Sequence, residues 1–165
     1  MFYNTPARQK FLKKDVAEAN AVAQIMDKLA LSYPNIKFRF IRDGETKLLT
    51  YGNGDLLSVI SSVYGRDFAK MVPVESRWDG YILTGYVSKP TDARPSRSFQ
   101  TFFVNDRPVK SALLVRALEE AYRNQLMTGK FPACVLHLHL NPNAVDVNVH
   151  PAKTEVKFLS EKAVF

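Results

Sequence analysis

Hydrophobic and polar residues repeat along this chain in patterns that predict three helices and seven short strands. Apolar residues recur at helical spacing in three runs: one over residues 15–31, one that Asp55 caps and Gly65 closes, and one that Ser111 caps. Alternating apolar and polar residues, separated by turn residues, indicate strands at 36–40, 47–51, 68–75, 81–88, 99–104, 133–140 and 145–149. This order suits an α+β fold, a two-layer sandwich of a mostly antiparallel sheet with helices packed on one face.

Side-chain spacing adds detail to the helices. Asp15 and Glu18 are expected to form a capping box at the start of the first helix. In the third helix, Glu119 and Arg123 are spaced to pair on the outer face. The apolar face expected for the first helix is Val16, Ala19, Val22, Ile25, Met26 and Leu29.

Composition limits the class of protein. With 165 residues and 46% hydrophobic residues, the chain is one ordinary globular domain with a real core. No apolar run approaches the length of a bilayer span and no signal peptide opens the chain, so we expect no membrane contact and a cytoplasmic protein. The single cysteine, Cys134, excludes an internal disulfide, and its apolar neighbours predict a core thiol rather than a nucleophile.

The formal net charge of +7 is concentrated in two stretches. Four bases precede the first acid, Asp15, and six bases stand against two acids between Lys89 and Arg116. Clustered positive charge favours contacts with phosphate groups.

Several kinds of catalytic site are missing from the sequence. There is no P-loop, no Gly-x-Ser-x-Gly elbow and no paired carboxylates. His137 and His139 share one face of a predicted strand, but histidines spaced in this way usually mark the solvent face. With no carboxylate cluster beside them, and His150 further along the chain, no metal site is predicted.

Three ordered motifs carry a family resemblance. Residues 2–8 and 10–12 read Phe-Tyr-Asn-Thr-Pro-Ala-Arg and Lys-Phe-Leu, and residues 103–109 read Phe-Val-Asn-Asp-Arg-Pro-Val. Residues 145–158 read Val-Asp-Val-Asn-Val-His-Pro-Ala-Lys-Thr-Glu-Val-Lys-Phe. In this order they resemble motifs in the N-terminal ATPase region of MutL-type DNA mismatch repair proteins, which belong to the GHKL ATPases.

The resemblance implies a fold and a place in a longer protein. The fold would be like domain two of a small-subunit ribosomal protein, with a left-handed βαβ crossover. Residues 1–14 would form the junction to a missing GHKL ATP-binding subdomain, and residues 15–165 the second, transducer subdomain. The motifs that hold ATP and Mg²⁺ belong to the missing subdomain. We therefore expect the full-length protein to be an ATPase that uses ATP and Mg²⁺, while this part alone binds no cofactor and is inactive.

The resemblance also assigns residues. Lys153 would be the catalytic, ATP-binding lysine that contacts the γ-phosphate, supported by Asn148, His150 and Pro151. Thr5, Pro6 and Arg8 would belong to the subdomain junction. Candidates for DNA binding in the basic loops are Arg94, Arg97, Arg107 and Lys110.

One position departs from the family. Asp106 stands where the family commonly has glycine, and Asn-Asp favours a type I′ turn less than Asn-Gly does, so the direction of Arg107 is in doubt.

The implied function is to couple ATP binding and hydrolysis to conformational change, dimerisation and DNA binding. The implied partners are DNA, bound largely independently of sequence, a MutS-type mismatch recognition protein and a second MutL chain, as a homodimer. The setting would be the bacterial cytoplasm and nucleoid, or the nucleus in a eukaryote.

Two alternatives remain open. The first is the transducer domain of another GHKL enzyme, such as a type II topoisomerase, although that group uses a Gln-Thr-Lys loop that this chain lacks. The second is a stand-alone nucleic-acid-binding module of the same fold, which would explain the charge but not the first and last motifs.

Overall fold

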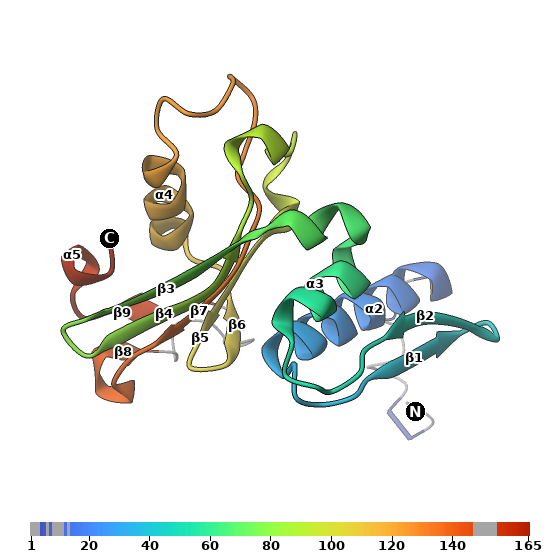
Figure 1. The fold of residues 1–165 in the computed structure, drawn as a ribbon. Coiled ribbons are helices and arrows are strands. Elements are labelled where there is room, and N and C mark those ends of the chain that lie inside the picture. The colour runs from blue at the N-terminus through green and yellow to red at the C-terminus, as the bar shows by residue number, and fades with distance from the viewer. Residues whose placement is uncertain (1–3, 6, 8–11, 13, 147–154) are drawn as a thin grey trace.

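The computed structural model describes residues 4, 5, 7, 12, 14–146 and 155–165 (Figure 1). The helices are α2 (Asp15–Ser32), α3 (Leu56–Tyr64), α4 (Ala112–Ala121) and α5 (Glu161–Val164), with 3-10 turns η1 (Arg66–Lys70), η2 (Pro90–Asp92), η3 (Arg97–Phe99) and η4 (Pro142–Ala144). The strands are β1 (Arg39–Arg42), β2 (Glu45–Leu49), β3 (Val72–Trp78), β4 (Tyr81–Val87), β5 (Gln100–Val104), β6 (Arg107–Val109), β7 (Cys134–His139), β8 (Val145–Asp146) and β9 (Lys157–Phe158). None of the described helices combines the length and apolarity of a membrane span.

A five-stranded sheet organises the larger part of the molecule. Its strand order is β3-β4-β7-β5-β6, and every neighbouring pair is antiparallel except β5 and β7, which run parallel. The chain passes from β5 to β7 through β6 and α4, so a βαβ crossover is present; its left-handedness stays a prediction. The expected α+β fold with a mostly antiparallel sheet is confirmed.

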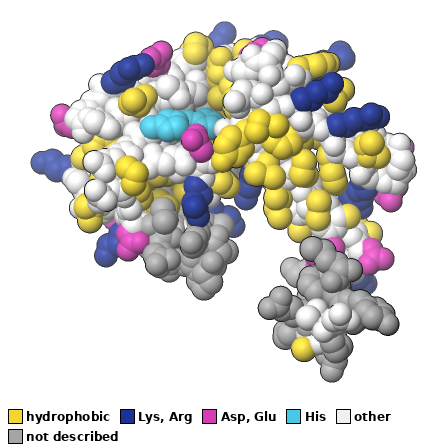
Figure 2. Space-filling model, turned by 90° about the horizontal axis from the view of Figure 1, so that it is seen from below, with side chains coloured by type: hydrophobic (Ala, Val, Ile, Leu, Met, Phe, Trp, Pro, Cys, Tyr) yellow, Lys and Arg dark blue, Asp and Glu magenta, His cyan; other side chains and the backbone are white. Residues whose placement is uncertain are grey.

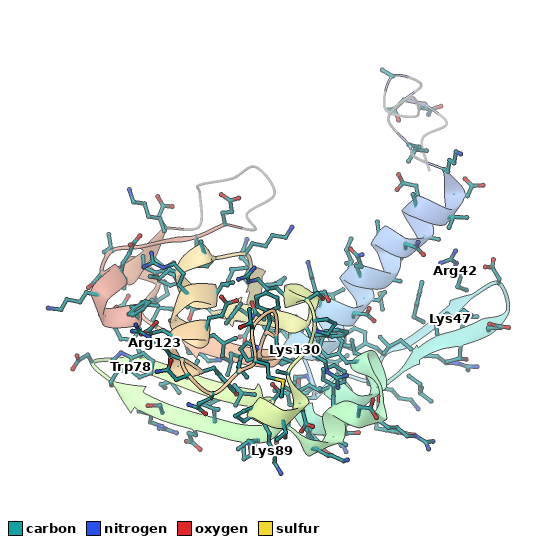
Figure 3. The ribbon with its side chains drawn as sticks, turned by 90° about the horizontal axis from the view of Figure 1, so that it is seen from above. Arg42, Lys47, Trp78, Lys89, Arg123 and Lys130 are labelled. Carbon is teal, nitrogen blue, oxygen red and sulfur yellow. The ribbon has the colours of Figure 1, made fainter. Side chains whose placement is uncertain are left out.

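The two faces of the sheet belong to two core clusters. Phe102 and Leu136 pack with Leu114 and Leu118 of α4 and with Val164 of α5. On the opposite face, Phe103 and Val135 pack with residues of α2, α3 and η1, among them Ala30, Ile60 and Phe68. Figure 1 shows these parts: α4 and α5 lie over one face, and a unit of α2, α3 and the β1–β2 hairpin lies beside the sheet. Trp78 marks one outer end of the molecule, and Arg42 and Lys47 mark the other (Figure 3).

Helix α2 has the predicted extent but not the predicted surroundings. Its N-cap is Lys14, without a side-chain hydrogen bond, so the expected capping box with Asp15 is wrong. Its apolar face is largely uncovered, with Val16 64% and Ile25 58% exposed, because α2 contacts the rest of the chain mainly through its C-terminal half. Figure 2 shows hydrophobic side chains gathered over this part of the molecule.

Elsewhere, local sequence signals predict most of the helix starts correctly. Asp55 caps α3 by accepting hydrogen bonds from two backbone N–H groups, and Ser111 caps α4. The predicted strand 68–75 is wrong at its start: residues 66–70 form η1, since Phe68 is buried between Tyr64 and Phe99 at ring distances of 5.3 and 5.1 Å.

Two surface expectations from the sequence are also wrong. Arg123 pairs with Glu120 at 2.8 Å rather than with Glu119, which is bound to Arg97. His137 is only 7% exposed, because β7 is a central strand with both faces covered.

Candidate nucleic-acid interface

Basic side chains gather along the β6 edge of the sheet. Arg97 in η3 and Lys110 after β6 line a groove of about 320 Å³ together with Lys28 of α2. Arg97 and Lys110 also line a neighbouring groove of about 580 Å³ that contains Lys157 of β9. Strand β6 is a sheet edge, and such edges are accessible to other molecules. The structure therefore brings two of the four predicted DNA-binding residues into one concave surface. Among the described residues, the smaller groove is lined by bases and by no acid, whereas Glu155 and Glu161 offset part of the positive charge of the larger groove.

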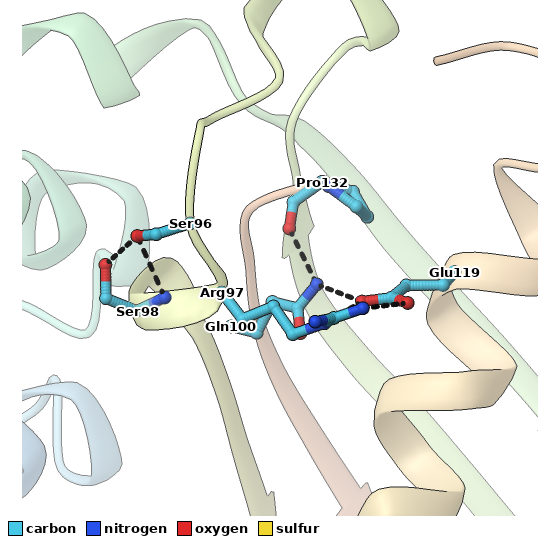
Figure 4. A network of polar contacts seen from close by, with 6 residues as sticks. All are labelled: Ser96, Arg97, Ser98, Gln100, Glu119 and Pro132. Atoms are coloured by element: carbon cyan, nitrogen blue, oxygen red, sulfur yellow. Dashed lines mark hydrogen bonds and ion pairs between the residues drawn. The ribbon is translucent and has the colours of Figure 1, made fainter. Parts of the chain in front are cut away.

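Arg97 is held by a network of polar contacts. Its Nε and one terminal nitrogen donate to the two carboxylate oxygens of Glu119 at 2.6 and 3.0 Å, and Gln100 donates to the same carboxylate at 3.3 Å (Figure 4). The guanidinium also lies 4.1 Å from the centre of the Phe131 ring. Hydrogen bonding to Arg97 lowers the pKa of Glu119, so the carboxylate is charged at neutral pH and offsets part of the arginine charge.

Arg94 lies apart from this groove and is packed into the fold. Its guanidinium lies 4.3 Å from the centre of the Phe68 ring, and its Nε is buried without a hydrogen-bond partner among the described residues. Its backbone N–H and C=O pair with those of Phe131 at 2.8 Å. A half-buried arginine stacked on an aromatic ring contributes to packing as well as charge.

Arg107 and Lys110 stand at the two ends of β6 and are exposed. Within the described part of the chain, neither side chain has an ion pair or a hydrogen bond. Arg107 lines a groove of about 510 Å³ against α2, where Lys28 and Ser32 are also found. Lys28 thus borders the grooves of about 320 and 510 Å³. The sequence did not indicate this residue, because only the contact of α2 with β6 brings it to this edge.

The Asn105-Asp106 turn before Arg107 has the left-handed conformation that a type I′ turn requires, although it contains no glycine. Asn105 and Asp106 have φ values of 47° and 64°. The Asn105 side chain bonds the N–H and C=O of Leu140, each at 3.0 Å, and this clamp fixes the turn beside the end of β7.

The segment that carries the lysine motif is framed by described strands. Lys153, Asn148, His150 and Pro151 lie outside the described residues, as do Pro6 and Arg8, while Thr5 is exposed. On either side of residues 147–154, β8 pairs with β9: Val145 is opposite Phe158 and Asp146 is opposite Lys157. Phe158 is 5% exposed in the core cluster that includes α4. The described residues on both sides of this segment are therefore part of the main body of the fold.

Sequence comparison supplies close relatives. A family model described as "DNA mismatch repair protein, C-terminal domain" matches residues 60–165. The DNA mismatch repair protein MutL of Shouchella clausii is 45% identical over 165 residues, covering 99% of this chain and 25% of the relative. MutL of Lactococcus lactis is 43% identical, covering 98% of this chain and 25% of the relative.

Solved structures agree with the sequence relatives. A crystal structure of the N-terminal domain of a DNA repair protein has a TM-score of 0.75 and 29% identity, covering 99% of this chain and 55% of that one. The Aquifex aeolicus MutL ATPase domain complexed with ADP has a TM-score of 0.65 and 25% identity, covering 86% and 50%. The gyrase B subunit of Myxococcus xanthus, at 15% identity and a TM-score of 0.51, shares the fold alone.

These similarities first define a class: the chain has the α+β fold found in the ATPase regions of DNA repair proteins. The MutL matches cover nearly the whole chain at more than 40% identity, whereas the topoisomerase likeness stops at the fold. The chain belongs to the MutL family of DNA mismatch repair proteins. It spans about a quarter of the length of the MutL relatives.

Proposed function

We propose that this chain couples ATP binding and hydrolysis in an adjacent ATP-binding subdomain to conformational change, dimerisation and DNA binding. The observation that carries the proposal is the pairing of β8 with β9 on either side of residues 147–154, because Phe158 of β9 packs in the same core as α4. In this proposal, a displacement at the nucleotide is transmitted through these two strands to the sheet. The similarity to a MutL ATPase domain solved with ADP supports the same assignment; the match covers 86% of this chain and 50% of that domain.

In this proposal Lys153 is the catalytic, ATP-binding residue, and Asn148, His150 and Pro151 support it. An ammonium group placed at the γ-phosphate stabilises charge that develops on the transferring oxygens and distinguishes ATP from ADP. A charge-assisted contact of this kind contributes about 1.5–3 kcal/mol. ATP and Mg²⁺ would be bound by the complete ATPase region, and the 165-residue chain alone would neither bind nor hydrolyse ATP.

The experiment is steady-state ATP hydrolysis by the intact ATPase region. Lys153→Ala should lower turnover by about tenfold or more, in line with the free energy of one such contact. Lys157→Ala, an exposed lysine four positions on in β9, is the matched control and should leave turnover unchanged. Equal turnover of Lys153→Ala and the parent protein would remove Lys153 from the nucleotide site.

We propose that residues 1–14, with Thr5, Pro6 and Arg8, form the junction to the ATP-binding subdomain, and that residues 15–165 form the transducer subdomain. The exposed apolar face of α2 supports a contact here, because Val16, Val22, Ile25 and Leu29 remain 39–64% exposed, which is unusual for so many apolar residues on one helix.

We also propose that the β6 edge binds DNA largely independently of sequence. The groove supplies lysine and arginine side chains without a motif that reads base edges, which suits phosphate contacts. Arg97, Arg107 and Lys110 are the proposed contacts. Lys28, which lines the grooves next to them, is a fourth. Arg94 would act indirectly, by holding the segment that leads to Arg97.

Charge reversal tests the DNA proposal by fluorescence anisotropy with a labelled duplex and a single strand. The double variant Arg107→Glu/Lys110→Glu should weaken binding and flatten its dependence on salt, by about one unit of logarithmic slope per lost phosphate contact. Lys47→Glu/Arg77→Glu makes the same change in net charge on β2 and on β3, the opposite edge strand, and serves as the control. Equal loss in both double variants would show that net charge alone, and not this edge, binds DNA.

The remaining partners are proposals from the family. We propose a homodimer that acts with a MutS-type mismatch recognition protein in the bacterial cytoplasm, in keeping with the bacterial MutL relatives. Light scattering of the ATPase region with and without a non-hydrolysable ATP analogue tests dimerisation: the analogue should double the mass, and an unchanged mass would oppose the proposal.

A further inference from the structure

Two histidines and a carboxylate meet at the end of β7. One ring nitrogen each of His137 and His139 and one carboxylate oxygen of Asp106 lie within 4.8 Å of one another. The distance from Nε2 of His139 to Oδ1 of Asp106 is 3.7 Å. Figure 2 shows histidine side-chain atoms visible from one side of the molecule, with an acidic side chain beside them. The sequence offered no carboxylate near the histidines; the β5–β6 turn supplies it.

His137 has two features of a metal-binding side chain. Its ring is stacked on Phe103, with ring centres 4.5 Å apart. Its Nε2 is buried and has no hydrogen-bond partner in the described part of the chain. A buried polar atom without a partner costs free energy, and a bound cation would offset that cost.

Asp106 reaches the histidines from a strained position. Its φ of 64° is a left-handed conformation that costs a non-glycine residue about 1 kcal/mol or more. The turn is held in place because Asn105 bonds Leu140 and the Ser32 hydroxyl donates to the Asp106 carbonyl. Strain retained in a firmly held turn often accompanies a function.

We propose that Asp106, His137 and His139 form a three-ligand site for a divalent transition metal ion, with Zn²⁺ as the preferred occupant and water completing the coordination. Imidazole and carboxylate ligands in a 2:1 ratio suit Zn²⁺ better than Mg²⁺ or Ca²⁺, which bind oxygen ligands.

The required adjustment is small. Bonds of about 2.1 Å in a tetrahedral site place the ligand atoms about 3.4 Å apart. The separations, all within 4.8 Å, must therefore shrink by at most about 1.4 Å, and the 3.7 Å between His139 and Asp106 by about 0.3 Å. His139 and Asp106 have side chains 41% and 49% exposed and can turn toward the buried His137. Lys28 and Arg107 line the adjoining groove and oppose a cation electrostatically. The negative charge of Asp106 offsets that repulsion, so its removal should be costly.

The test is isothermal titration calorimetry of the chelator-treated 165-residue chain with Zn²⁺ alone. One Zn²⁺ should bind per chain, and Asp106→Asn and His139→Gln should each weaken binding about tenfold or more. A control variant, Asp43→Asn, alters another carboxylate in a left-handed turn, at φ 53°, and should retain the parent affinity within about twofold, as surface changes away from a site usually do.

A second measurement places the ion and separates loss of folding from loss of binding. In nitrogen-15 NMR of the folded parent chain, Zn²⁺ should shift the ring nitrogens of His137 and His139 but not those of His150. Circular dichroism should show both site variants folded, since the altered side chains are partly exposed. Absence of saturable binding, unchanged affinity in Asp106→Asn, or shifts at His150 alone would overturn the proposal.

Discussion

Asn105 is joined to Leu140 by two hydrogen bonds, as if it continued the pairing of β5 with β7 through its side chain. The amide Nδ2 donates to the Leu140 carbonyl and the Leu140 N–H donates to Oδ1, both at 3.0 Å. The Asn105 N–H also donates to the carbonyl of Leu138 at 3.0 Å. The turn that follows is thereby fixed beside β7, with Asp106 near the histidines and Arg107 on the basic edge.

Removing the Asn105 side chain should destabilise the fold in a way that separates its hydrogen bonds from its backbone conformation. Asn105→Gly loses the two bonds but tolerates φ 47°, so we expect a loss of about 1–3 kcal/mol in the free energy of unfolding. Asn105→Ala should lose about 1 kcal/mol more, because alanine disfavours the left-handed region. Urea unfolding measures the free energy of unfolding of both variants. Equal stability of Asn105→Gly and Asn105→Ala would contradict the expected cost of the left-handed conformation.

The matched control for Asn105 is Asn53→Ala. Asn53 is exposed and its side chain accepts a single hydrogen bond, from the Asp55 N–H at 3.1 Å. We expect a loss of about 0.5–1 kcal/mol, the ordinary contribution of one hydrogen bond.

Gly85 is the position where the sheet tolerates no side chain. It lies in the interior of β4 at φ 135°, and a Cβ added there would stand 2.1 Å from the carbonyl oxygen of Val135 in β7. Gly85→Ala should therefore force β4 and β7 apart and cost on the order of 3–5 kcal/mol, the range of severe core substitutions.

Gly44→Ala is the control for this clash. Gly44 also has a positive φ, 77°, but a Cβ would meet nothing within 4 Å, so only the backbone cost of about 1 kcal/mol is expected. Thermal unfolding followed by circular dichroism distinguishes the two, and similar melting temperatures would refute the close approach of β4 and β7.

Arg94 should affect stability before it affects DNA binding. Arg94→Met keeps much of the packing on Phe68 but loses the cation–π contact at 4.3 Å, for an expected loss of about 0.5–2 kcal/mol. Arg94→Glu should cost more, because it places a carboxylate against the ring. If DNA affinity falls in Arg94→Glu but is retained in Arg94→Met, Arg94 contributes through the fold; comparable loss in both folded variants would instead indicate a direct contact.

Much of the fold could be predicted because its signals are local. Asp55 and Ser111 mark helix starts through side-chain oxygens that accept from nearby N–H groups, and Asp43-Gly44 and Asp79-Gly80 mark hairpins through their left-handed backbone. Such signals need no knowledge of distant residues. The extent of α2 could also be predicted from the sequence. The exposure of its apolar face could not, because periodicity shows that an apolar face exists but not which other elements cover it.

The candidate site was less predictable, because its contacts join residues far apart in sequence. Charge clustering found Arg97 and Lys110, but not the binding of Arg97 to Glu119 or the presence of Lys28 in the same groove. Strand alternation placed His137 and His139 on one face, but the central position of β7 buries His137. In each case the outcome depends on which strands are neighbours.

Stability should fall as the pH drops through the range in which His137 titrates in the unfolded chain. Burial, followed by the neighbouring His139, lowers the pKa of His137 in the folded state, although Asp106 and the Leu31 backbone act in the opposite sense. Below its ordinary pKa of about 6.5 the unfolded chain takes up a proton that the folded chain does not, so unfolding is favoured there. The free energy of unfolding should be highest above about pH 7 and should decline toward the folded-state pKa, below which this contribution is constant.

Replacing His137 isolates this effect. In His137→Phe, measured with a chelator present, the decline between about pH 7 and pH 5 should become shallower, because phenylalanine keeps the stack on Phe103 without titrating. His139→Gln, at a more exposed position on the same strand, should retain most of the decline, since burial is the larger cause of the shift. If instead the His137→Phe and parent curves run parallel, the decline comes from other groups and His137 is not held neutral by the fold.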